Sequence, residues 1–189
     1  MTWLVIGLVL FLGIHSVSIV APAWRDGVVA QRGEGPWKGV YSLVSLLGLV
    51  LLVYGYGQAR QAPVQLYVPP AALRHVAWLL MLPVFVLLIA SNLPGRIKAA
   101  AKHPMLLAVK LWATAHLLAN GSLADVLLFG GFLAWAVIDR ISMKRRIQRP
   151  TPGLPPGRWN DLIAVVGGLA AYGAFIGGVH LWLFGVAPR

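Results

Sequence analysis

The sequence contains no cysteine and few acidic residues. Its 189 residues include 5 Asp and Glu against 16 Lys and Arg, and charged residues make up only 11% of the chain. Without cysteine the chain cannot form disulfides, thiolate zinc sites, iron–sulfur clusters or thiolate-ligated haem. A bound transition metal would therefore need histidine ligands, of which the chain has five.

Apolar residues dominate the composition. They make up 59% of the chain, and the mean hydropathy is +0.77. A soluble domain has about 45 to 50% apolar and about 25% charged residues. The composition therefore predicts an integral membrane protein, with the lipid bilayer as its main partner and with no soluble domain.

Six apolar segments are candidates for membrane-spanning helices, because crossing about 30 Å of hydrocarbon takes about 20 residues. Continuous apolar runs favour helices over the alternating pattern of a barrel strand. We therefore expect an all-α bundle of six transmembrane helices. The first segment has no basic residue before it and no A-x-A-like cleavage site, so we expect a retained helix. The segments are 2–20, 39–57, 73–92, 105–120, 123–141 and 162–186, the fourth being short.

The basic residues predict the orientation of the bundle. Twelve Lys and Arg lie in the odd-numbered connections and three on the opposite side, so the positive-inside rule places both termini outside the cytoplasm. This distribution also explains the net charge of +11 without a nucleic-acid partner. The twelve are Arg25, Arg32, Lys38, Arg96, Lys98, Lys102, Arg140, Lys144, Arg145, Arg146, Arg149 and Arg158.

Several local features can be predicted as well. Residues 25–38, rich in Gly and charge, read as a cytoplasmic loop. Asn120-Gly121 predicts a tight antiparallel hairpin of the two helices it joins. Asp125 lies one turn into its helix, where the dipole favours a carboxylate, and Asp161 is expected to cap the last helix. That helix should pack closely through small residues, namely Gly167, Gly168, Gly173, Gly177 and Gly178.

The five histidines fall at two depths in this topology. His15 and His103 lie toward the cytoplasmic face, whereas His75, His116 and His180 lie toward the external face. A b-type haem held by two imidazoles needs histidines from two helices at one depth. The depth count therefore pairs His15 with His103, and His116 with His180 as the alternative. For each histidine a simple hydrogen bond to a neighbouring helix remains open.

Lys110 is the other costly residue in an apolar segment. It lies about 9 Å beyond Pro104 along the helix, within reach of the cytoplasmic interface. It either extends to that interface or pairs with a haem propionate, a substrate carboxylate or Asp139. Trp112 is expected to pack against neighbouring helices.

Three stretches of the sequence carry a family resemblance: Gly13-Ile14-His15-Ser16, Lys102-His103-Pro104 and Ala115-His116-Leu117-Leu118-Ala119-Asn120-Gly121. With them the chain resembles the NnrU family of bacterial membrane proteins, and the resemblance covers nearly the whole chain as a single domain, 1–189. This family is associated with denitrification and with nitrite and nitric oxide metabolism. It is similar in turn to zeta-carotene isomerases, which use haem b to isomerise a 15-cis double bond of a polyene. The resemblance implies a bacterial inner membrane protein with His15 and His103 as haem ligands, although Lys102 replaces the usual Arg.

Three functions follow in order of preference. The first is a haem b protein, which could in addition be a haem-dependent isomerase acting on a hydrophobic small molecule. The second is a non-enzymatic accessory or sensor that signals through the basic segment 144–158. The third is an S-adenosylmethionine-dependent membrane methyltransferase, because the His-Pro motif also resembles that of isoprenylcysteine methyltransferases. Those enzymes carry a Tyr shortly after the Pro and a Glu on the next helix. Here Met105 follows Pro104, and the next helix has no Glu. No catalytic residue and no oligomeric state are assigned.

Overall fold

The computed structural model describes residues 1–147, 149 and 153–188. These residues contain helices and no β-strand, and the all-α prediction is confirmed; an isolated bridge joins Gln65 to Ser122. The chain forms two compact units. The first contains Met1–Val68 and Gly121–Ile147, and the second contains Pro69–Asn120 and Gln148–Arg189.

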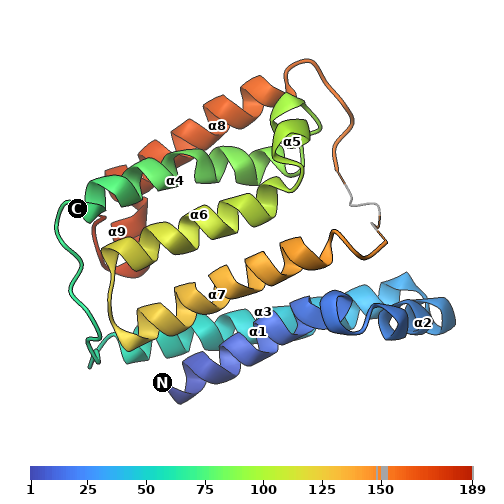
Figure 1. Ribbon diagram of the computed structural model, residues 1–189, viewed down its shortest axis with the longest axis horizontal. Helices are drawn as coiled ribbons and strands as arrows, with labels where there is room; N and C mark the ends of the chain where they lie inside the picture. The colour runs from blue at the N-terminus through green and yellow to red at the C-terminus, as the bar shows by residue number, and fades with distance from the viewer. Residues whose placement is uncertain (148, 150–152, 189) are drawn as a thin grey trace. The chain divides into compact units, whose positions relative to one another are not determined.

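Three long helices build the first unit: α1 (Thr2–Val20), α3 (Glu34–Ala59) and α7 (Leu123–Ser142). They run side by side in Figure 1. Trp135 of α7 lies beside His15 of α1, and Phe132 beside Phe11, so α7 runs parallel to α1. Tyr41 also lies beside His15, whereas Gly55 contacts Leu4, so α3 runs antiparallel to both.

A short helix, α2 (Pro22–Arg32), follows α1 in place of the predicted loop at 25–38, so that prediction was wrong. Ala21 has non-helical angles, and Pro22 at the first helical position suits the start of a new helix. Gly33 ends α2 with a φ of 85°, which glycine tolerates without strain. This helix contains several polar residues, so a search for long apolar runs did not find it.

Glycines set the contact between α1 and α3. A Cβ added at Gly48 would lie 2.7 Å from the Phe11 backbone nitrogen, and one at Gly55 would lie 2.7 Å from the Leu4 Cα. A Cβ at Gly7 would lie 2.7 Å from the Leu52 Cα. Small residues allow backbones to approach this closely, which is how helices gain packing contacts in lipid.

The first turn of α7 is closed by a capping box. The Asp125 amide donates to Ser122 Oγ at 3.2 Å, and the Ser122 amide donates to Asp125 Oδ2 at 2.9 Å. The Tyr56 hydroxyl of α3 donates to Asp125 Oδ1 at 2.6 Å. The predicted place of Asp125 at the helix start is confirmed, and the same carboxylate also ties α7 to α3.

The second unit contains α4 (Leu73–Ala90), α5 (Arg96–Ala101), α6 (Pro104–Ala119) and α8 (Asn160–Ala174). The helices α6 and α8 both pack against α4 (Figure 1). A cluster around Val84, Leu87 and Ala108 fills the contact between α4 and α6, and Trp112 packs against it as expected.

Asp161 does not cap the helix in which it lies, so that prediction was wrong. It occupies the first turn of α8, where its carboxylate accepts hydrogen bonds from the backbone amides of Arg96 at 2.8 Å and Ile97 at 3.0 Å. These amides begin α5 and have no partner within that helix. Gly95 leaves room for the carboxylate, since a Cβ there would collide with it. Asp161 thus caps α5 across the unit.

The last predicted span, 162–186, is interrupted. After α8 the chain forms a π-helical turn, η1 (Phe175–Val179), and a short helix, α9 (His180–Phe184). Gly178 lies in this turn with a φ of 153°. The predicted close packing of small residues is confirmed at Gly168, where a Cβ would lie 2.6 Å from the Val86 Cα, whereas nothing lies within 4 Å of a Cβ at Gly173.

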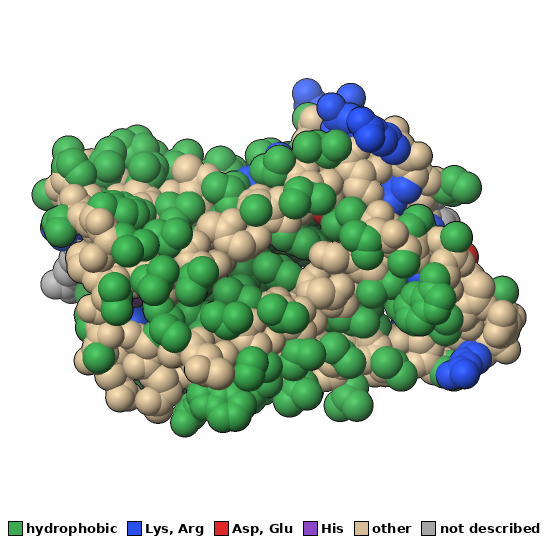
Figure 2. Space-filling view, turned by 60° about the horizontal axis from the view of Figure 1, so that its bottom comes forward, with side chains coloured by type: hydrophobic (Ala, Val, Ile, Leu, Met, Phe, Trp, Pro, Cys, Tyr) green, Lys and Arg blue, Asp and Glu red, His purple; other side chains and the backbone are tan. Residues whose placement is uncertain are grey.

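Four helical segments are long and apolar enough to cross a membrane: α1, α3, α4 and the stretch from Asn160 to Phe184. Large apolar side chains lie exposed on them, as at Leu43 (68%) and Leu79 (71%), and Figure 2 shows apolar side chains over much of the visible surface. Such surfaces suit lipid. The apolar helix α6 has 16 residues, and α7 has 20 with charges near both ends, so these two stay predicted spans.

Candidate functional site

His15 lies on α1, half-buried, with its ring oriented by its own helix. The Nδ1 atom bonds the Phe11 carbonyl oxygen at 2.6 Å. Because a carbonyl oxygen only accepts, Nδ1 carries the hydrogen in this arrangement and Nε2 keeps its lone pair. A hydrogen bond from one ring nitrogen that fixes the tautomer and orientation is typical of metal-binding histidines.

Aromatic side chains from three helices surround the His15 ring. Phe11 stacks on it with ring centroids 4.3 Å apart, Tyr41 lies at 5.1 Å, and Trp135 meets it edge-on at 6.0 Å. Trp37 lies 6.3 Å from Tyr41 and extends the cluster along α3. The imidazole therefore stands in a largely apolar surrounding contributed by α1, α3 and α7.

An ion pair lies one helical turn beyond Trp135. Arg146 Nη2 donates to Asp139 Oδ1 at 2.8 Å, and the two side chains are only 16% and 9% exposed. This pair was not predicted from the sequence, where Asp139 was considered only as one of three partners for Lys110. Asp139 and Arg146 are seven residues apart, which is about two helical turns. This spacing at the end of a helix could have indicated the pair.

Two donors beside this pair are buried without an acceptor among the described residues. They are Nη1 of Arg146 and Nε1 of Trp135. Leaving a buried donor unsatisfied costs roughly 1–3 kcal/mol. Both belong to α7 or to the turn that follows it, as does Asp139.

His103 lies in the second unit, at the break between α5 and α6. It is the N-cap of α6, with φ −134° and ψ 69°, and Pro104 is the first residue of that helix. Lys102 before it has a φ of 59°, which is uncommon for a residue with a side chain. Backbone strain of this kind gathers at functional sites. The Lys-His-Pro motif thus forms a sharp turn that leaves His103 half-buried.

The pairing of His15 with His103 stays a prediction, because the two residues belong to different units. Lys110 lies half-buried on α6 in the second unit, and its predicted role also stays a prediction. The hairpin predicted at Asn120-Gly121 falls where one unit ends and the other begins.

The alternative pair, His116 and His180, lies within the second unit. The Nδ1 atom of His116 bonds the Trp112 carbonyl at 2.9 Å, and that of His180 bonds the Val186 carbonyl at 2.6 Å. Each of these rings is therefore held through Nδ1 by a backbone carbonyl, as the His15 ring is. No group of three or more His, Asp or Glu in the described part of the chain is placed to hold a metal ion.

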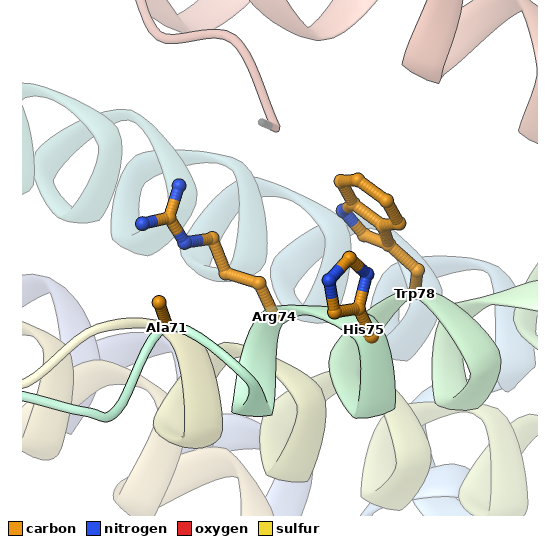
Figure 3. A pocket seen from close by; sticks show the side chains of 4 residues that line it. All are labelled: Ala71, Arg74, His75 and Trp78. Atoms are coloured by element: carbon orange, nitrogen blue, oxygen red, sulfur yellow. The ribbon is translucent and has the colours of Figure 1, made fainter.

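His75 lies in the first turn of α4. Figure 3 shows Arg74, His75 and Trp78 projecting from one side of α4. With Ala71 they line an open hollow of about 240 Å³. The Trp78 indole donates to the Pro188 carbonyl at 2.9 Å and so holds the C-terminal segment. An exposed His beside a Trp at a helix end fits the interfacial position expected for His75.

Comparison with known families agrees with the sequence motifs. The family described as NnrU protein matches residues 3–188, nearly the whole chain, and this chain therefore belongs to the NnrU family. Comparisons with curated proteins and with solved structures give no match.

Proposed function

We propose that this NnrU family protein binds haem b in the bacterial inner membrane, with His15 and His103 as the axial ligands. The observation that carries the proposal is the hydrogen bond from His15 Nδ1 to the Phe11 carbonyl, which leaves the Nε2 lone pair available within an aromatic cluster. His103 is proposed from the resemblance to haem-dependent isomerases, which have a ligand in the matching motif.

The residues around His15 fit the needs of a haem ligand. A neutral imidazole with one nitrogen bonded to a carbonyl is the form that binds iron. Phe11 stacks on the ring, and Tyr41 and Trp135 lie beside it, so aromatic side chains from three helices border the imidazole. The absence of cysteine is compatible with a b-type haem held by histidines.

Haem b, when bound, would supply redox-active iron chemistry for a hydrophobic substrate. The chain's own part is to orient the imidazole through Phe11 and to keep the site apolar. Lys110 is proposed to offset the charge of a propionate or of a substrate carboxylate. This chemistry supports an isomerase-like activity on a hydrophobic polyene as an extension of the proposal, in cells that reduce nitrite or nitric oxide.

The proposed orientation places the basic end of the first unit in the cytoplasm. The end of α1, the start of α3 and the end of α7 meet there, with Arg25, Lys38 and Arg140 among the cations. The positive-inside rule favours this orientation. The same basic end offers a contact surface if the protein is an accessory or sensor, which is the second candidate function.

The test is an absorption spectrum of protein purified in detergent. We expect His15→Ala and His103→Ala each to lose the Soret band or to shift it toward a high-spin spectrum. His116→Ala and His180→Ala are matched controls, because each also removes an imidazole bonded through Nδ1. Loss of haem in the controls, with retention in the first two variants, would move the site to the alternative pair.

A further inference from the structure

The proposed haem site leaves the two unsatisfied donors unexplained. Nη1 of Arg146 and Nε1 of Trp135 are buried and have no acceptor in the described part of the chain. Buried polar groups in native proteins nearly always have partners, so each orphan calls for an explanation such as a ligand or a water. Both groups can only donate hydrogen bonds. The missing partner therefore has to be an acceptor.

Both donors lie at the end of the first unit that contains His15. The Trp135 ring lies 6.0 Å from the His15 ring, centroid to centroid. Asp139 follows Trp135 by four residues, so their side chains share one face of α7. Asp139 in turn holds Arg146 at 2.8 Å. The two donors therefore belong to the same end of the first unit as the candidate haem ligand.

The charges at this end favour an anion over a neutral acceptor. Arg146 uses Nη2 for a single bond to one oxygen of Asp139, so its planar fork is only partly occupied. Arg140, Lys144 and Arg145 add positive charge, and the acidic residues Asp26 and Glu34 at this end are paired with Arg25 and Lys38. A carboxylate accepts several hydrogen bonds and matches the guanidinium fork.

We infer that Arg146 and Trp135 form a carboxylate-binding site beside His15, which holds the acidic group of the ligand that this end of the unit takes up. The inference rests on the proposed function where the ligand is haem, because a haem propionate then supplies the carboxylate. A long-chain fatty acid offers the same chemistry from another source. Asp139 is a positioning residue that holds Arg146 in place.

The first experiment compares haem b with its dimethyl ester, in which both propionates are neutral. Apoprotein in detergent is titrated with each, and the dissociation constants are read from the Soret band. A hydrogen bond to a charged group changes affinity by about 10- to 100-fold. We therefore expect the wild type to prefer haem b over the ester by at least about 10-fold.

Two variants test the donors without removing the fold. Trp135→Phe keeps an aromatic ring against His15 and removes the N–H together with part of the indole ring. Arg146→Lys keeps a cation for Asp139 and removes the second arm of the fork. Both should lower the preference for haem b over the ester. Arg145→Lys, at an exposed neighbouring position, is the matched control and should leave the preference unchanged. Equal preference in wild type and both variants would overturn the inference.

A second probe separates this inference from the haem proposal. Palmitate and methyl palmitate are compared by the shift that each causes in the unfolding temperature of the same proteins. If the wild type binds no haem, the proposed function fails, and a palmitate shift that Trp135→Phe removes would still support the carboxylate site. If neither haem nor palmitate shows a preference for the free acid, the carboxylate site is refuted.

Discussion

The buried ion pair of Asp139 and Arg146 gives a sharp prediction about stability. In Asp139→Asn the side chain keeps its shape and can still accept a hydrogen bond, but Arg146 loses its counter-charge. Removing one partner of a buried pair costs about 3–5 kcal/mol. With side chains 9% and 16% exposed, we expect a loss near the lower end, about 3 kcal/mol in the free energy of unfolding.

The chain provides a matched control in the pair of Glu34 and Lys38. These side chains approach to 3.1 Å but are each 61% exposed, so Glu34→Gln should cost less than about 0.5 kcal/mol. Unfolding of both variants is followed in the same detergent by circular dichroism against denaturant. The double variant Asp139→Asn with Arg146→Gln should recover part of the loss. Equal losses for Asp139→Asn and Glu34→Gln would refute the reasoning.

Three further predictions concern the packing and caps of the helices. Gly55→Leu should separate α1 from α3 and cost about 1–3 kcal/mol, whereas Gly57→Leu, with nothing within 4 Å of its Cβ, should be nearly neutral in the same unfolding assay. Tyr56→Phe should cost about 1.5–3 kcal/mol, because Asp125 then loses the hydroxyl that bonds its Oδ1; an unchanged unfolding midpoint would argue against that bond. Asp161→Ala should remove the cap of α5 and speed amide hydrogen exchange at its first turn, and protection equal to wild type would contradict this.

The apolar runs predicted much of the helical framework. The first helix was predicted at 2–20 and found at Thr2–Val20, and the helix predicted at 123–141 ends at Ser142. These agreements follow from length and hydropathy, which the bilayer constrains strongly. The helix α2 was missed because it is short and polar, and its ends depend on local geometry at Ala21 and Gly33.

Polar contacts between distant segments were beyond the reach of the sequence. Asp161 has the sequence signature of a cap for its own helix, yet it bonds amides of α5 that lie 64 and 65 residues earlier. The aromatic surroundings of His15 also depend on the packing of α1, α3 and α7. The histidine itself could be predicted, because an imidazole in an apolar helix is costly and its motif resembles that of a known family.

Haem content is the measurement that tests the central claim most directly. The wild-type protein is produced in cells supplied with a haem precursor, purified in detergent, and its bound haem is quantified by absorption against protein concentration. The account predicts a Soret band with about one haem b per chain. It also predicts that His15→Ala, purified alongside with equal yield, has lost that stoichiometry. A wild type with no Soret band, or a His15→Ala variant with unchanged haem content and spectrum, would contradict it.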